Sequence, residues 1–286
     1  MSASSPLFRF VQAELPWQLG PPEGRYLLRP EAGPDASPSH VVVLATLGAP
    51  ERRRLARQRR DAPPEPAPTP VATTRVTVIE VGSPAATPEE ARTWLAQAGQ
   101  AELEAGFEVL NRVLHAYRLV TADPYLHPVS RGQAIVSRLG FGVGEQVADG
   151  LWSDAREINV RETRRRRLRV LHPQARLAAV LGAREAPLAC EELVLRARLD
   201  IDHGRDREAA LQLLVALDTA LAELAVDPRG AELASRLPEL RGRREVTAEA
   251  AQAALSGAIS AAQREAVVFT LERIESALRA RAVANA

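Results

Sequence analysis

Residues Glu185–Leu224 read EAPLACEELVLRARLDIDHGRDREAALQLLVALDTALAEL and form the longest strongly periodic segment of the chain. Apolar residues that recur every three or four positions are typical of amphipathic helices. Gly204 interrupts this pattern between Leu188–His203 and Arg207–Leu224. The segment therefore predicts two helices that fold against each other at a Gly204 turn, and it predicts fold rather than chemistry.

Further helical patterns surround this pair in the C-terminal part. We expect helices at Gln174–Leu181, Ala231–Arg241, Thr247–Ile259 and Ala262–Arg281, with the second weakened by Pro238. From His172 onward no stretch is strand-like. Residues 172–286 are therefore predicted to form an all-helical domain, arranged as a helical hairpin within an antiparallel bundle.

The first part of the chain mixes strand and helix patterns. The runs His40–Leu47 and Arg75–Val81 are rich in β-branched residues and are predicted to pair antiparallel. We expect shorter strands at Arg25–Arg29, Gln133–Leu139 and Ala155–Val160. Four prolines within residues 1–24 predict an irregular or briefly helical start. Without βαβ regularity, residues 1–160 are predicted to be an α+β domain with a small, mainly antiparallel sheet.

Two helices are predicted inside this α+β domain. Thr87, Pro88 and two glutamates form a helix-start signature. After Gly99 a second helix continues to about Val120, with an apolar stripe at three- and four-residue spacing. The segment 139–149, LGFGVGEQVAD, matches neither phosphate-binding fingerprint, and it predicts a glycine-bearing hairpin.

The chain contains two arginine-rich segments. Residues 50–73 combine ERRRLARQRR with a run of prolines and predict a disordered loop of polyproline character. Residues 161–171 contain RETRRRRLR and predict a hinge between the two domains. The arginines that we consider as contacts for an anion or a nucleic acid are Arg52, Arg53, Arg54, Arg57, Arg59, Arg60, Arg164, Arg165, Arg166 and Arg167.

The composition indicates the general class of the protein, but it does not indicate an activity. The chain has 286 residues, 46% of them hydrophobic and 26% charged, with a formal net charge of +1. Such a balance is ordinary for a globular protein and does not by itself predict a polyanionic partner. Cys190 is the single cysteine, which excludes an internal disulfide and a cysteine metal cluster. Lacking a membrane-spanning run and a signal peptide, the sequence favours the cytoplasm.

The helical pair resembles a single tetratricopeptide unit over residues 190–224. The resemblance rests on Gly204, Ala209, Leu213, Ala216 and Leu217, with Ala197 on the first helix. The sequence departs from the family where an aromatic residue is usual, because Leu199, Asp200 and Ile201 stand there. No second copy follows in tandem. The resemblance implies binding of a protein or peptide, whereas a generic helical hairpin implies no function.

Candidate chemical groups are few. His115, Asp123 and His127 flank one turn and, together with Glu145, define a candidate enzyme site or metal site. The sequence favours the simpler interpretation, in which His115 lies at the edge of an amphipathic helix and His127 lies in an exposed turn flanked by proline. Cys190 is expected to be a buried structural thiol, and His203 is expected to cap a helix. Asp200, Asp202 and Asp206 are expected to pair with neighbouring arginines.

These observations lead to three functional hypotheses. In the first, a non-enzymatic protein uses its helical domain for protein–protein interaction or self-association. In the second, the two arginine-rich segments bind nucleic acid without sequence preference. In the third, an enzyme uses a site near His115, Asp123, His127 and Glu145. No catalytic residue, cofactor or bound metal is assigned from the sequence.

Overall fold

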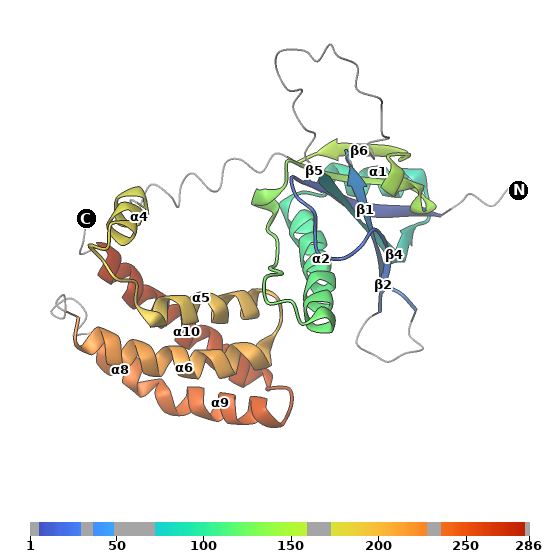
Figure 1. The fold of residues 1–286 in the computed structure, drawn as a ribbon. Coiled ribbons are helices and arrows are strands. Elements are labelled where there is room, and N and C mark those ends of the chain that lie inside the picture. Colours follow the sequence, from blue (N-terminus) through green and yellow to red (C-terminus); the bar gives the residue numbers. More distant parts are fainter. Residues whose placement is uncertain (1–5, 30–36, 49–71, 159–172, 228–235, 284–286) are drawn as a thin grey trace, which may run out of the picture. The chain divides into compact units, whose positions relative to one another are not determined.

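The computed structural model describes residues 6–29, 37–48, 72–158, 173–227 and 236–283 (Figure 1). The chain divides into two compact units, Met1–Glu162 and Thr163–Ala286. Both segments predicted as a loop and a hinge, residues 50–73 and 161–171, lie almost entirely outside the described ranges. No helix of the described residues is long and apolar enough to span a membrane.

A six-stranded antiparallel sheet forms the centre of the N-terminal unit and has the strand order β2-β3-β4-β1-β5-β6. This sheet, followed by a C-terminal set of helices, confirms the predicted α+β class. The strands are β1 (Leu7–Leu15), β2 (Gly24–Leu28), β3 (His40–Leu47), β4 (Thr73–Ala85), β5 (Val136–Val143) and β6 (Asp154–Glu157). The predicted pairing of the His40 and Arg75 strands is confirmed, since Val42 pairs with Val78 and Leu44 with Val76.

The expectation of an irregular start was wrong, because β1 is a central strand between β4 and β5. Its sequence, LFRFVQAEL, carries buried side chains on both faces of the sheet, including Phe10, Ala13 and Leu15. A strand covered on both sides does not show the simple alternation of a half-exposed strand. Pro6 and Pro16 flank β1 and do not interrupt it.

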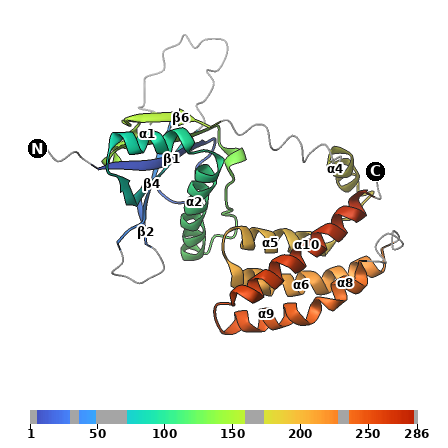
Figure 2. The ribbon, with the colours of Figure 1, turned by 180° about the vertical axis from the view of Figure 1, so that it is seen from behind.

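One face of the sheet is covered by α1 (Pro88–Gln97) and α2 (Gln100–Thr121), as Figure 2 also shows. The predicted start of α1 is confirmed, because the Thr87 hydroxyl accepts a hydrogen bond from the Glu90 amide. The apolar stripe of α2 buries Leu103, Phe107 and Leu110 against strand residues such as Val42 and Leu139. This layer contains the main core of the unit.

The opposite face of the sheet is partly covered by the 3-10 helix η2 (Gly144–Asp149), which follows β5 directly. Val147 of η2 packs with Phe10, Val41 and Ile79. The predicted glycine hairpin is confirmed only in part: β5 does pair with a following strand, and Gly140 lies opposite Ala155, but residues 144–149 form η2 and the partner strand is β6. A Cβ at Gly140 would lie 2.5 Å from the Phe10 ring, so packing explains this glycine. A second 3-10 helix, η1 (Arg131–Gln133), precedes β5, so the strand begins at Val136 and not at Gln133 as expected.

The C-terminal unit is helical in all its described elements. Its helices are α4 (Pro173–Leu181), α5 (Ala189–Asp202), α6 (Asp206–Ala225), α8 (Leu237–Gly242), α9 (Arg244–Ser256) and α10 (Ala261–Val283). Residues 231–235 of a predicted helix lie outside the described ranges. Pro238 falls in the first turn of α8, where no intrahelical donor is needed, so it does not weaken the helix as expected.

The hairpin of α5 and α6 forms the centre of this unit. Gly204 has a φ of +67° at the turn, a left-handed conformation that favours glycine. Small and large residues alternate in the buried face of α6, where Ala209, Leu213, Ala216 and Leu217 are fully buried. Val267, Leu271 and Ile274 of α10 complete the same core. The hairpin thus organises the C-terminal unit alone.

Candidate functional site

The four residues of the predicted enzyme site do not converge. Glu145 lies in η2 and forms an ion pair with Arg25, whose Nε is 2.5 Å from Glu145 Oε2. His115 belongs to α2, on the opposite face of the sheet. The Asp123 carboxylate accepts a hydrogen bond from the Tyr125 amide at 2.9 Å. Among the residues that the structure describes, no group of three potential ligands could hold a metal ion.

Cys190 lies in the first turn of α5 and is fully buried. The Glu223 carboxylate accepts hydrogen bonds from the backbone amides of Ala189 and Cys190, both at 3.0 Å, so it caps α5. Burial, together with the neighbouring Glu223 carboxylate, raises the pKa of the Cys190 thiol to about 12. A thiol with this pKa is not a nucleophile at neutral pH, and its buried position agrees with a structural role.

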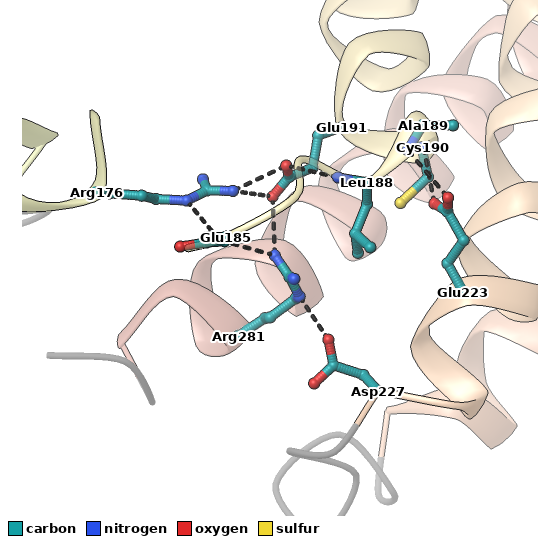
Figure 3. Close-up of polar contacts among 9 residues, drawn as sticks. All are labelled: Arg176, Glu185, Leu188, Ala189, Cys190, Glu191, Glu223, Asp227 and Arg281. Atoms are coloured by element: carbon teal, nitrogen blue, oxygen red, sulfur yellow. Dashed lines mark hydrogen bonds and ion pairs between the residues drawn. The ribbon is translucent and has the colours of Figure 1, made fainter. Parts of the chain in front are cut away.

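A network of charged side chains joins α4, α5, α10 and the end of α6 (Figure 3). Arg281 of α10 is 4% exposed, and its Nε donates to the Asp227 carboxylate at 2.7 Å. Its Nη1 donates to Glu191 at 3.2 Å and lies 3.6 Å from the carboxylate of Glu185. Arg281 is thus neutralised within the chain by carboxylates from three segments.

Arg176 extends this network to α4. Its Nη2 lies 2.7 and 2.8 Å from the two carboxylate oxygens of Glu191, and its Nε donates to Glu185 at 3.1 Å. Both glutamates are therefore shared between Arg176 and Arg281, as Figure 3 shows. We name Arg176, Glu185, Glu191, Asp227 and Arg281 the buried charge network. Its geometry fits a structural connection between helices.

The acidic cluster beside Gly204 is paired, although not always with the expected partner. Asp200 binds Arg205 at 2.7 Å, and Asp202 lies 3.9 Å from Arg198. Asp206, however, pairs with Arg264 of α10 at 3.0 Å. The expected capping role fits His203, the C-cap residue of α5, because its Nδ1 lies 2.7 Å from the Leu199 carbonyl and donates to it.

A different group of arginines lies along the contact between α8 and α10. Arg236 Nη1 donates to the Ser276 hydroxyl at 2.9 Å, and Arg243 Nε donates to the Thr270 hydroxyl at 3.3 Å. Between them, Arg273 Nη1 lies 3.8 Å from the Glu239 carboxylate. The α8–α10 seam, as we name it, consists of Arg236, Glu239, Arg243, Phe269, Thr270, Arg273 and Ser276.

Phe269 occupies one end of this seam and is 41% exposed. The guanidinium carbons of Arg243 and Arg273 lie 4.9 and 5.0 Å from its ring centroid, which is cation–π distance. Within the described residues, no carboxylate lies within 4 Å of Arg236 or Arg243. The seam therefore combines unneutralised guanidinium groups with a partly exposed aromatic ring.

The sequence did not predict this seam, because its two groups of residues, 236–243 and 269–276, are separated by more than 20 positions in the chain. The arginines that it did select lie elsewhere: Arg52, Arg53, Arg54, Arg57, Arg59, Arg60, Arg164, Arg165, Arg166 and Arg167 all fall outside the described residues. A usable signal was present in the arginines of Arg236–Arg244, RLPELRGRR, which precede a helix carrying Phe269 and Arg273.

Comparison with known proteins provides no relative for this chain. No family model matches it, and neither a curated protein nor a solved structure does. Function therefore has to be argued from the chain's own residues.

Proposed function

We propose that this is a non-enzymatic protein of the cytoplasm whose helical unit associates with a second copy of the same chain. The observation that carries the proposal is α4, a mostly apolar helix that fully buries none of its described side chains. Leu177 and Leu181, one turn apart, are 57% and 78% exposed. Removing such a pair from water would stabilise a complex.

The outer face of α5 carries a matching pair. Leu195 and Leu199 are also one turn apart and are 65% and 37% exposed. Because both pairs belong to one chain, two copies can exchange them reciprocally, α4 of each copy covering α5 of the other. Such an exchange is a self-complementary contact with twofold symmetry, the commonest arrangement of homodimers. Protein binding by the α5–α6 hairpin is also what its tetratricopeptide resemblance implies.

The attachment of α4 favours this exchange. In the described part of the chain, α4 is held to its own unit through the Arg176 ion pairs with Glu185 and Glu191. Arg176 is one-third exposed, and ion pairs of partly exposed groups contribute little free energy. A helix held in this way can leave its own unit at small cost and pack on a partner.

The oligomeric state tests the proposal. Light scattering coupled to size exclusion should give a dimer for the wild type and a monomer for Leu177→Glu/Leu181→Glu and for Leu195→Glu/Leu199→Glu. Leu255→Glu is the matched control, because Leu255 lies on α9 and is 62% exposed. This variant should remain dimeric. A wild-type chain that stays monomeric at its highest soluble concentration contradicts the proposal.

A second candidate function is sequence-independent binding of nucleic acid by the two arginine-rich segments. It is supported by the sheet topology, which places the attachment points of both segments at the same end of the sheet. One segment lies between Leu47 and Thr73, which pair with each other, and the other follows Glu157, which pairs with Arg138. Because Glu14 pairs with both Arg75 and Val136, these attachment points share one end of the sheet. Salt-sensitive binding that disappears when either arginine block is changed to glutamine would support this function, and binding indifferent to those changes would contradict it.

A further inference from the structure

We propose that the α8–α10 seam is a binding site for single-stranded nucleic acid. This inference concerns residues outside both arginine-rich segments and does not depend on the contact proposed for α4. It follows from the charge, the aromatic ring and the shape of the seam.

The charge of the seam is not balanced by its own residues. It contains three arginines, Arg236, Arg243 and Arg273, but one carboxylate, Glu239, whose distance to Arg273 is 3.8 Å. Arg236 and Arg243 use one N–H group each on a hydroxyl, which is neutral. Because a guanidinium group has five donors, most of their donors are not used by these contacts. Carboxylate and phosphate oxygens are the acceptors that suit such groups best.

The spacing of the arginines suits a chain of phosphates rather than a single anion. Their partners on α10 are Thr270, Arg273 itself and Ser276, so the three groups follow one helix over six residues. At 1.5 Å per residue this is roughly 9 Å along the helix axis. The three guanidinium groups therefore form a row and not a cluster around one point.

Phe269 favours a nucleic acid over other polyanions, because an exposed aromatic ring can stack on a base. Its ring is 41% exposed beside the guanidinium groups of Arg243 and Arg273. Proteins that bind single strands combine a positive track for the backbone with aromatic and arginine planes on which bases stack. A duplex offers no free base faces for stacking. Stacking on an aromatic ring tolerates any base, because every base has a π-face, so the seam should bind without strong sequence preference.

The surroundings of the seam argue against a flat anionic surface such as a membrane. Glu265 and Glu272 lie on α10 one turn before Phe269 and just after it, and both are exposed. A membrane surface broad enough to reach the seam would meet both carboxylates. A single strand is narrow enough to follow the arginines without that repulsion.

The test is fluorescence anisotropy of a labelled twelve-nucleotide oligothymidylate with the full-length protein at low salt. We expect Arg236→Gln and Arg243→Gln each to weaken binding at least threefold and Phe269→Ala to weaken it at least fivefold, with Phe269→Trp retaining affinity. Arg264→Gln is the matched control, because Arg264 lies on α10 and is paired with Asp206. It should bind like the wild type. With two or three phosphates contacted, the logarithm of affinity should fall with that of salt at a slope of about −1.4 to −2.1.

Competition experiments test whether the seam prefers a single strand to other polyanions. Circular dichroism of each variant verifies that it is folded. Inorganic polyphosphate, a twelve-base-pair duplex and vesicles containing phosphatidylserine should each compete at least fivefold more weakly than the unlabelled strand. The proposal is overturned if the oligonucleotide does not bind, or if polyphosphate binds equally well and Phe269→Ala has no effect. It is also overturned if vesicles or the duplex compete better, or if changing Arg164–Arg167 to glutamine abolishes binding while the seam variants retain it.

Discussion

Two sets of arginines in the same helical unit have opposite environments. In the buried charge network, Arg281 is 4% exposed and contacts carboxylates of Asp227, Glu191 and Glu185. In the α8–α10 seam, Arg236 and Arg243 bind hydroxyl groups, and Arg243 also contacts an aromatic ring. The arginines of the first set are paired with carboxylates inside the chain, whereas Arg236 and Arg243 of the second set have hydroxyl partners that carry no charge.

This difference shows that the role of an arginine, in stability or in ligand binding, depends on its partners more than on the number of arginines nearby. A buried arginine cannot lose its proton, so the fold must supply carboxylates for it, and removing it takes a close cationic partner away from each of those carboxylates. An arginine at the surface with a hydroxyl partner can be removed with little effect on folding. Stability and ligand binding should therefore respond to different arginines.

The largest expected effect is that of Arg281→Met. The substitution leaves Asp227, whose side chain is 3% exposed, without its 2.7 Å partner, which should lower the free energy of unfolding by about 3–5 kcal/mol. Urea unfolding followed by circular dichroism at 222 nm measures it. Tryptophan fluorescence should not change, because Trp17, Trp94 and Trp152 all lie in the N-terminal unit. Arg279→Met, at a 58% exposed arginine of the same helix, should cost less than about 0.5 kcal/mol.

A second effect is a loss of stability at alkaline pH that depends on Cys190. The folded pKa, about 12, lies above the unfolded value of 9.0, so the unfolded chain loses the thiol proton first. Stability from the neutral thiol is complete below pH 9 and is lost as pH rises toward 12. Between pH 8 and 10.5 the wild type should lose about 2 kcal/mol more than Cys190→Ala. Parallel pH curves for both proteins would contradict this.

A smaller effect is expected for Arg176→Gln, which removes the ion pairs that hold α4. Hydrogen exchange of the α4 amides should accelerate about fivefold, corresponding to roughly 1 kcal/mol. Adding 0.5 M salt to the wild type should act in the same direction. Arg184→Gln, at an exposed arginine that follows α4, serves as the control. Unchanged exchange in Arg176→Gln would mean that other contacts hold α4.

The smallest effect on folding is expected at the seam. Arg243→Gln removes a cation–π contact with the exposed Phe269 ring and a hydrogen bond to the buried Thr270 hydroxyl, which keeps its contacts with Thr247 and the Ala266 carbonyl. Its free energy of unfolding should change by no more than about 0.5 kcal/mol. A loss comparable to that of Arg281→Met would show that the seam is structural and would remove the contrast between the two sets.

Much of the fold could be predicted from local patterns. The strand His40–Leu47, the Thr87 cap and the turn at Gly204 each depend on neighbouring residues, so local rules identified them. The strand β1 could not be recognised in this way. Its apolar residues point to both faces because the sheet is covered on both sides, which is a consequence of tertiary structure.

The candidate sites were harder to predict because charge compensation is a long-range property. The sequence shows arginines in runs, but it does not show that Arg281 meets Asp227 or that Arg243 meets Phe269. Nor does the sequence show that the sheet lies between Glu145 and His115, which excludes a shared site. Both of these contacts, Arg281 with Asp227 and Arg243 with Phe269, join residues more than 20 positions apart.

Unfolding with and without a single strand tests the central contrast most directly. A ligand that binds the folded state raises its apparent stability. Excess oligothymidylate should therefore raise the urea midpoint of the helical unit, read at 222 nm, by the same amount for the wild type and for Arg176→Gln, and by a smaller amount for Arg243→Gln. An equal increase in Arg243→Gln, or a loss of the increase in Arg176→Gln, would contradict the assignment of the two arginine sets.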